Sequence, residues 1–147
     1  MKKVTIVFLA LFLVTKSVYP LRMGLEFGVS DKATVGLNLR LVENFELKPA
    51  LGFTFTEDDN FFALSVDGNF YLPQIQTLQH YAGPGIWFNV NSDDGYVGVN
   101  GKYGLRYNIN EVLSTFGEIG LNVQFSPFIL TTFRGGLGMT FYFPGMK

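Results

Sequence analysis

The last stretch of the chain, residues 131–143, places the strongest constraint on the fold. Its alternate positions are mostly apolar or aromatic: Thr131, Phe133, Gly135, Leu137, Met139, Phe141 and Phe143. The positions between them are small or polar, with one charge at Arg134. A period of two residues is typical of a β-strand, because successive side chains point to opposite faces of a sheet. At about a dozen residues, the segment is longer than a usual strand and suits a tilted strand that crosses a bilayer.

The same alternation recurs from residue 21 onwards. Seven further segments of roughly ten residues set apolar side chains against glycine, small polar residues and isolated charges: residues 21–30, 33–43, 45–56, 62–72, 81–91, 97–107 and 113–125. Pro49 interrupts the third segment, where we expect an edge or a bulge. A longer link, Pro73 to Gln79, precedes the fifth segment. Eight consecutive strands predict a closed, antiparallel up-and-down barrel, because closure removes unpaired strand edges.

The C-terminal alternation, with its aromatic end, resembles the closing strand of bacterial outer-membrane β-barrels. In that family a terminal aromatic residue belongs to the signal that the insertion machinery recognises. The resemblance therefore implies that Phe141 and Phe143 form this signal and that the insertion machinery is a partner. Here Pro144, Gly145, Met146 and Lys147 follow the last aromatic residue, which is a small departure from the family pattern.

Composition narrows the possible functions. With 147 residues the chain is long enough for one domain. Its formal net charge of −1 gives no basic surface for nucleic acid. Cysteine is absent, which excludes disulfides, thiolate metal sites and a cysteine nucleophile. The 17 glycines and 16 phenylalanines favour a β-rich chain over a helical bundle, because glycine is costly inside helices.

The N-terminus has the pattern of a secretory signal peptide. Lys2 and Lys3 precede an apolar run, residues 4–14, of the length expected for the hydrophobic region of such a peptide. This run is too short to span a bilayer as a helix, which takes about 20 residues. We predict a signal peptide over residues 1–19, cleaved near residues 17–20, followed by a barrel domain over residues 20–147. An uncleaved anchor or a buried helix is the alternative.

Two kinds of barrel share this alternation. A lipocalin-like carrier would keep its apolar face inward around a ligand, with Leu37, Leu39, Phe53 and Phe88 inside. A membrane barrel is inverted, with its apolar face against lipid and with Arg40, Glu118 and Arg134 inside. The polar face is rich in glycine and small polar residues, which suit the narrow interior of an eight-stranded barrel. The sequence therefore favours the membrane barrel.

In a membrane barrel, the charges on the polar strand faces would lie in the lumen. We expect a network of ion pairs there, because buried charges are costly unless they are paired. The predicted members are Arg22, Glu26, Arg40, Glu46, Lys48, Asp67, Lys102, Arg106, Glu118 and Arg134. Such a network could plug a narrow gated ion conduit, or it could be a structural filling that fixes strand register. The structural filling is the favoured interpretation.

No catalytic, metal or cofactor site is predicted. Enzymes of this architecture, the lipid A deacylases and palmitoyltransferases, rely on a histidine with serine or other polar partners. The one histidine, His80, is followed two places later by Ala82 and falls on the lipid-facing side. Asp58-Asp59 and Asp93-Asp94 could collect divalent cations at a lipopolysaccharide surface, but ordinary exposed turns have the same composition. Gly83-Pro84-Gly85 lacks the strand–loop–helix context of a phosphate loop.

Together, the pattern predicts an all-β, eight-stranded antiparallel transmembrane β-barrel, similar to the small OmpX- and OmpA-type barrels. The resemblance implies an integral protein of the outer membrane, surrounded by lipid and lipopolysaccharide. We expect a structural or surface-interaction role without catalysis or cofactors. An exported carrier of a hydrophobic ligand and a narrow gated conduit are the alternatives. The sequence leaves the ligand, the partner and the oligomeric state open.

Overall fold

The computed structural model of the chain describes residues 22–55, 60–90, 95–126 and 128–144. The predicted signal peptide and its cleavage position lie outside this range. Within it, no helix has the length and the apolar character needed to cross a membrane.

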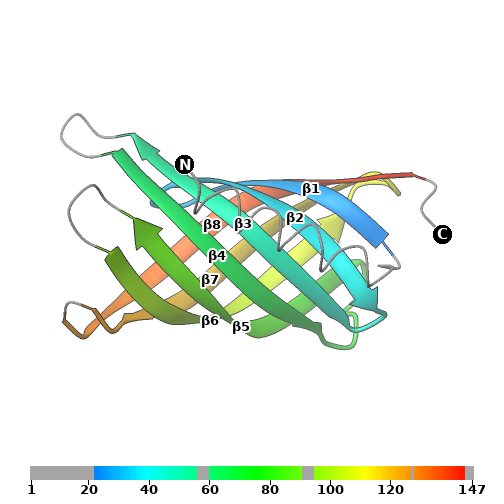
Figure 1. Cartoon of the computed structure of the whole chain (residues 1–147). Coiled ribbons are helices and arrows are strands. Elements are labelled where there is room, and N and C mark those ends of the chain that lie inside the picture. The colour runs from blue at the N-terminus through cyan, green and yellow to red at the C-terminus, as the bar shows by residue number, and fades with distance from the viewer. Residues whose placement is uncertain (1–21, 56–59, 91–94, 127, 145–147) are drawn as a thin grey trace.

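Eight β-strands form one closed antiparallel sheet in which each strand pairs with its sequence neighbours (Figure 1). They are β1 (Arg22–Val29), β2 (Ala33–Val42), β3 (Phe45–Phe55), β4 (Asn60–Tyr71), β5 (Leu78–Val90), β6 (Gly95–Asn108), β7 (Leu113–Gln124) and β8 (Leu130–Tyr142). The sheet closes where β1 pairs with β8, from Gly24 opposite Tyr142 to Val29 opposite Leu137. This topology confirms the predicted fold class.

The barrel has two ends, which we name by their turns. The distal end carries the β1–β2 and β7–β8 turns, and the proximal end carries the start of β1 and the end of β8 (Figure 1). The β2–β3, β4–β5 and β6–β7 turns also lie at the proximal end, since consecutive strands run in opposite directions.

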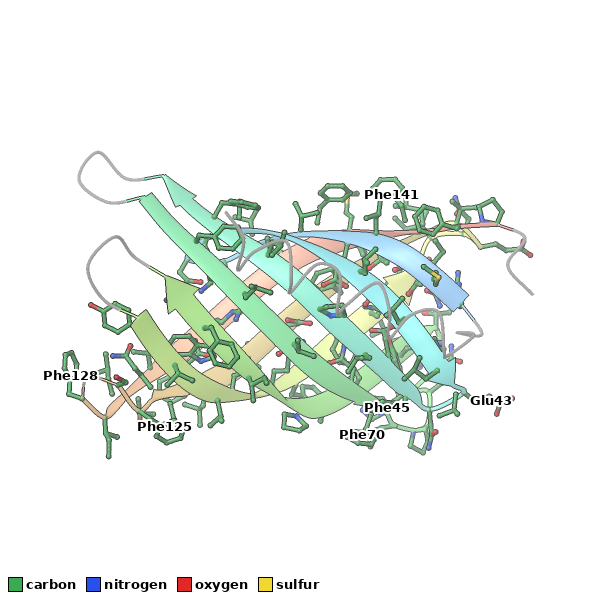
Figure 2. The ribbon with its side chains drawn as sticks, in the orientation of Figure 1. Glu43, Phe45, Phe70, Phe125, Phe128 and Phe141 are labelled. Atoms are coloured by element: carbon green, nitrogen blue, oxygen red, sulfur yellow. The ribbon has the colours of Figure 1, made fainter. Side chains whose placement is uncertain are left out.

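Alternation along each strand separates an apolar exterior from a polar interior. Many outward side chains are strongly exposed, for example Phe133 at 91% and Ile119 at 68%, although Leu39 on the same face is 5% exposed. Inward side chains are buried even where they are charged, and both Glu46 and Arg106 are 0% exposed. Figure 2 shows apolar side chains around the outside of the ribbon. The interior of the molecule is therefore a polar core inside an apolar wall.

Both strand prolines interrupt one of their two ladders, because proline has no N–H to donate. In the β2–β3 pairing, the register runs from Gly36 opposite Ala50 to Leu39 opposite Leu47, and the partner of Pro49 is skipped. In the β4–β5 pairing, the register skips the position of Pro84. The predicted link from Pro73 to Gln79 is shorter in the structure, since β5 already begins at Leu78.

Candidate functional site: the ion-pair cluster of the lumen

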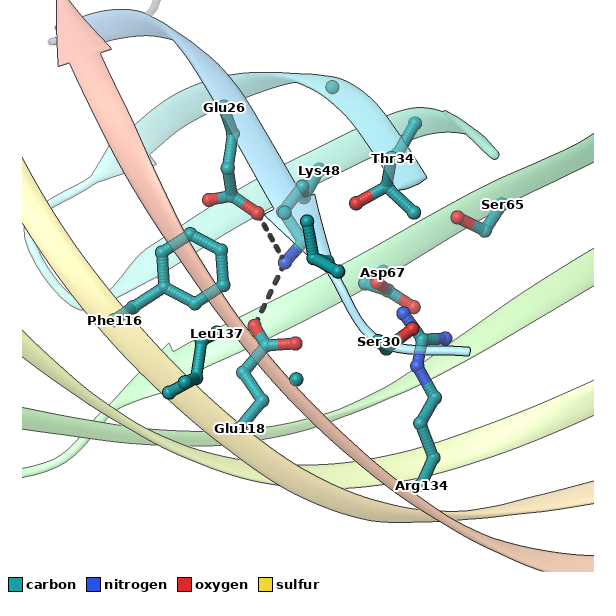
Figure 3. Close-up of a pocket in the computed structure, with 15 residues that line it drawn as sticks. Glu26, Ser30, Thr34, Lys48, Ser65, Asp67, Phe116, Glu118, Arg134 and Leu137 are labelled. Atoms are coloured by element: carbon teal, nitrogen blue, oxygen red, sulfur yellow. Dashed lines mark hydrogen bonds and ion pairs between the residues drawn. The ribbon is translucent and has the colours of Figure 1, made fainter. Parts of the chain in front are cut away.

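Lys48 lies at the centre of the lumen and joins two acids from other strands. Its Nζ lies 2.7 Å from Glu26 Oε1 on β1 and 2.9 Å from Glu118 Oε1 on β7 (Figure 3). All three side chains are buried or nearly so. The ring of Phe116 lies beside the ammonium, 5.2 Å from it. One cation of β3 thus connects opposite walls of the barrel.

A second lysine continues the network towards β4 and β6. Lys102 Nζ lies 2.9 Å from Asp67 Oδ2 and 3.4 Å from Glu118 Oε1. Neutral groups also donate hydrogen bonds to these carboxylates. Asn100 Nδ2 donates to Asp67 at 3.0 Å, and the Tyr81 hydroxyl donates to Glu118 at 2.8 Å. Each acid therefore has both a cation and a neutral donor, the arrangement that a buried charge requires.

Arg106 occupies the proximal half of the lumen and is fully buried. Its guanidinium lies 2.9 Å from Glu46 and 3.2 Å from Glu26. It also donates to the hydroxyls of Tyr71 and Tyr142. Because Glu26 also binds Lys48, the two halves of the network are continuous.

The three other predicted arginines make fewer or longer contacts with acidic side chains. Arg40 is 4.0 Å from Glu46 and stacks over the Tyr71 ring at 3.9 Å. Arg22 stacks over the Tyr142 ring at 3.5 Å and donates to the carbonyl of Glu111. Arg134 lines a cavity in the distal half of the lumen, described below, and makes no ion pair with a described residue.

The structure therefore joins the following predicted residues through ion pairs: Glu26, Arg40, Glu46, Lys48, Asp67, Lys102, Arg106 and Glu118. Arg22 and Arg134 lie outside these pairs, at the proximal and distal ends. Neutral partners missing from the predicted set include Asn38, Asn69, Asn100, Tyr71, Tyr81 and Tyr142. These residues alternate in phase with the charges along the strands, and this was the feature of the sequence that could have identified them as inward-facing partners.

The described part of the lumen contains small cavities, two of which lie beside the ion pairs. The larger has a volume of about 20 Å³ and is lined by Lys48, Asp67, Glu118 and Arg134 among others (Figure 3). The smaller, beside Asn122, has about 10 Å³. A cavity of the larger size holds about one water molecule. The arrangement can hold ordered water beside the ion pairs.

At the distal end, the β1–β2 turn adds charges near Arg134. The Ser30 hydroxyl donates to Asp31 Oδ1 at 2.6 Å. Partial burial acts to raise the pKa of Asp31, but this hydrogen bond and the charges of Lys32 and Arg134 outweigh it, so the pKa is lowered. Asp31 is therefore an anion at neutral pH.

His80 lies on the outward side near the proximal end, where it forms a hydrogen bond to the β4–β5 turn. Its Nε2 lies 2.6 Å from the Pro73 carbonyl, and the Tyr103 hydroxyl lies 3.2 Å from Nδ1. Since a carbonyl only accepts, Nε2 is the donor and Nδ1 accepts from the tyrosine. Both ring nitrogens are thus engaged in structural contacts.

The remaining candidates lie at the surface. The aspartate pairs 58–59 and 93–94 fall outside the described residues, and the described part of the chain contains no cluster of three potential metal ligands. Phe141 and Phe143 point outward at the proximal end, 43% and 39% exposed (Figure 2 labels Phe141).

No known protein family and no curated protein matches this chain. Solved structures do match. The N-terminal β-barrel domain of Pseudomonas aeruginosa OprF superposes with a TM-score of 0.65 and 18% identity, covering 83% of this chain and 96% of that one. The fold is that of the eight-stranded transmembrane barrels. A de novo designed transmembrane β-barrel gives a TM-score of 0.64 and 15% identity, covering 84% of this chain and 97% of the design. The expected likeness to small outer-membrane barrels is confirmed for the fold.

Proposed function

We propose that this chain is a small integral outer-membrane β-barrel with a structural or surface-interaction role and no catalytic activity. The observation that carries the proposal is the inverted distribution of side chains. Apolar residues such as Ile119 and Phe133 face outward, whereas fully buried Glu46 and Arg106 face inward. A wall of this kind suits lipid, because its outward side chains are apolar. The backbone N–H and C=O groups of its paired strands are satisfied by hydrogen bonds within the sheet.

The carrier alternative is less well supported. Ligand pockets in proteins usually have volumes of about 300–1,000 Å³. The cavity beside Lys48 has about 20 Å³, and charged groups line it. Phe88, which a carrier would direct inward, is 46% exposed on the outside. A hydrophobic ligand would therefore need extensive rearrangement of the ion pairs.

We further propose that the ion-pair cluster plugs the lumen. Lys48 connects β3 to β1 and β7, and Arg106 connects β6 to β1 and β3. Together they cross the interior in two places along the axis. A narrow gated conduit is the second candidate, favoured by the cavity on the distal side of Lys48.

In the proposed orientation, the proximal end faces the periplasm and the distal end faces the exterior. Lipid and lipopolysaccharide would surround the wall. Phe141 and Phe143 would present the C-terminal signal to the insertion machinery. The engagement of both His80 nitrogens by Pro73 and Tyr103 supports the absence of catalysis.

Fractionation of cells expressing the chain tests the proposal. We expect recovery in the outer membrane and faster gel migration before boiling than after it, because a closed barrel resists detergent. Recovery as a soluble periplasmic protein would contradict the proposal. In planar bilayers, the plugged barrel should pass little current, whereas frequent stepwise openings would favour the conduit.

A further inference from the structure

The two strands that close the barrel differ in length at the distal end. β8 has 13 residues and β1 has 8. Their pairing stops where Val29 meets Leu137, and Ser30 comes next to Gly136. Residues 130–135 of β8 therefore extend beyond β1, and no described residue pairs with them on that side. On the other side, β7 pairs with them up to Leu130. We call residues 130–135 the free edge.

Alternation shows which backbone groups the free edge exposes. The Phe143 N–H donates to the Met23 carbonyl beside β1, whereas the Tyr142 N–H donates to the Val112 carbonyl on the β7 side. Odd-numbered residues of β8 therefore direct their N–H and C=O groups towards β1. Above the end of β1, the corresponding residues are Thr131, Phe133 and Gly135.

Apolar side chains surround these backbone groups. Phe133 is 91% exposed, Ile129 is 77% exposed and Phe128 is 58% exposed. Figure 2 shows Phe128 at the distal tip of the β7–β8 hairpin, away from the barrel wall. The β1–β2 turn beside this hairpin is polar, with Ser30, Asp31 and Lys32. The distal tip thus combines an unpaired strand edge with an exposed apolar surface.

We propose that the free edge is a docking site for an extended segment of another protein, which adds as a strand beside β8. This inference deepens the proposed surface-interaction role and rests on it. Strand addition uses main-chain hydrogen bonds for affinity and alternate side chains for specificity. A long, exposed and apolar strand edge is the feature that promotes such pairing.

Lipid and a second copy fit this edge less well. Hydrocarbon cannot satisfy the N–H and C=O groups of Thr131, Phe133 and Gly135. Two copies in one membrane are related by a two-fold axis along the membrane normal. Strands tilted by about 40° would then cross at about 80°, too steeply to form a ladder. An external polypeptide can take the orientation that the ladder needs.

The neighbouring side chains define the segment that would bind. Residues directly opposite each other point to the same face of a sheet. The position opposite Phe133 should therefore be apolar, as Leu121 is on the β7 side. The position opposite Arg134 should be acidic, because Arg134 faces inward without an ion pair to a described residue. An apolar residue next to an acidic one is thus the expected signature.

A designed peptide tests this inference. The probe has the sequence of residues 119–124, which already pairs with β8 in the required register, with Gly120→Glu to face Arg134. Binding to the folded barrel in detergent is measured by fluorescence anisotropy, with a scrambled peptide as control. We expect saturable binding below about 1 mM. Binding of the scrambled peptide with equal affinity would overturn the proposal, as would no binding of the probe at this concentration.

Two variants of one residue locate the contact. Thr131→Pro removes an N–H of the free edge and leaves the β7 ladder intact, because that N–H faces away from β7. We expect it to weaken binding by about tenfold, whereas Thr131→Ala keeps the N–H and should bind like the parent. Equal affinity of all three would refute the assignment to this edge. The heat-dependent gel shift confirms folding of each variant, and failure of membrane recovery would refute the outer-membrane proposal separately.

Discussion

At the scale of single residues, the lumen depends on charges that share partners. Glu26 binds both Lys48 and Arg106, and Glu118 binds both Lys48 and Lys102. Removing one member therefore leaves the other buried charges with fewer partners. The loss of an ion-pair member costs more than the pair contributes, because the remaining charge is still desolvated.

Arg106 is the residue whose loss should be most destabilising. Arg106→Met leaves fully buried Glu46 with the more distant Arg40 as its one remaining cation among the described residues, and we expect the free energy of unfolding to fall by about 3–5 kcal/mol. Urea titration of the refolded barrel measures the change. Adding Glu46→Gln should restore part of the loss. Arg134→Met is the matched control, expected within about 0.5 kcal/mol of the parent. Equal effects of the two arginine substitutions would contradict the network.

Alternation in the sequence was sufficient to assign these charges to the inward face. It could not assign partners, because they come from strands far apart in the chain. Arg106 and Glu26 are separated by 80 positions, and they meet only after the sheet has closed. The uncharged members, such as Asn38 and Tyr142, resemble ordinary polar residues until their neighbours are known.

At the scale of one strand, two of the four glycines of β6 have opposite surroundings. A Cβ at Gly104 would overlap the Tyr81 ring, with the hydroxyl oxygen only 2.6 Å away, whereas a Cβ at Gly101 would meet nothing within 4 Å. We expect Gly104→Ala to lower the free energy of unfolding by about 1–3 kcal/mol. Gly101→Ala should be neutral or stabilising by up to about 1 kcal/mol. Urea titration of both variants measures the difference, and a neutral Gly104→Ala would contradict the close packing.

The β4–β5 turn should depend on His80. His80→Phe removes the hydrogen bonds to Pro73 and Tyr103, and we expect a loss of about 1 kcal/mol. Tyr103→Phe should have a smaller effect, because it removes only one of these bonds. In a double-mutant cycle followed by urea titration, the two changes should be non-additive. Full additivity would show that the residues do not interact.

Strand positions were easier to predict than strand ends. The alternation located every strand, but it placed the start of the fifth strand after Gln79, whereas β5 begins at Leu78. Leu78 and Ile75 pair as an isolated bridge across the turn, so the ladder extends into a segment with little alternation. The sequence also could not predict that β8 extends beyond β1 at the distal end. This difference depends on the register at which the barrel closes and not on either strand alone.

At the scale of the whole molecule, the proposal depends on the outward face being in contact with lipid. Ile119 tests this directly, because it is 68% exposed on β7 between Tyr103 and Gly135 of the neighbouring strands. Ile119→Arg would place a charge in hydrocarbon at a cost of about 2–4 kcal/mol. We expect a reduced folded fraction in lipid vesicles, measured by the gel shift on boiling. Gln74→Arg, in the exposed β4–β5 turn, should fold like the parent. A barrel whose exterior faced water would tolerate both arginines equally, because an exposed arginine would stay hydrated. Equal folding of the two variants would therefore show that the outward face contacts water and not lipid.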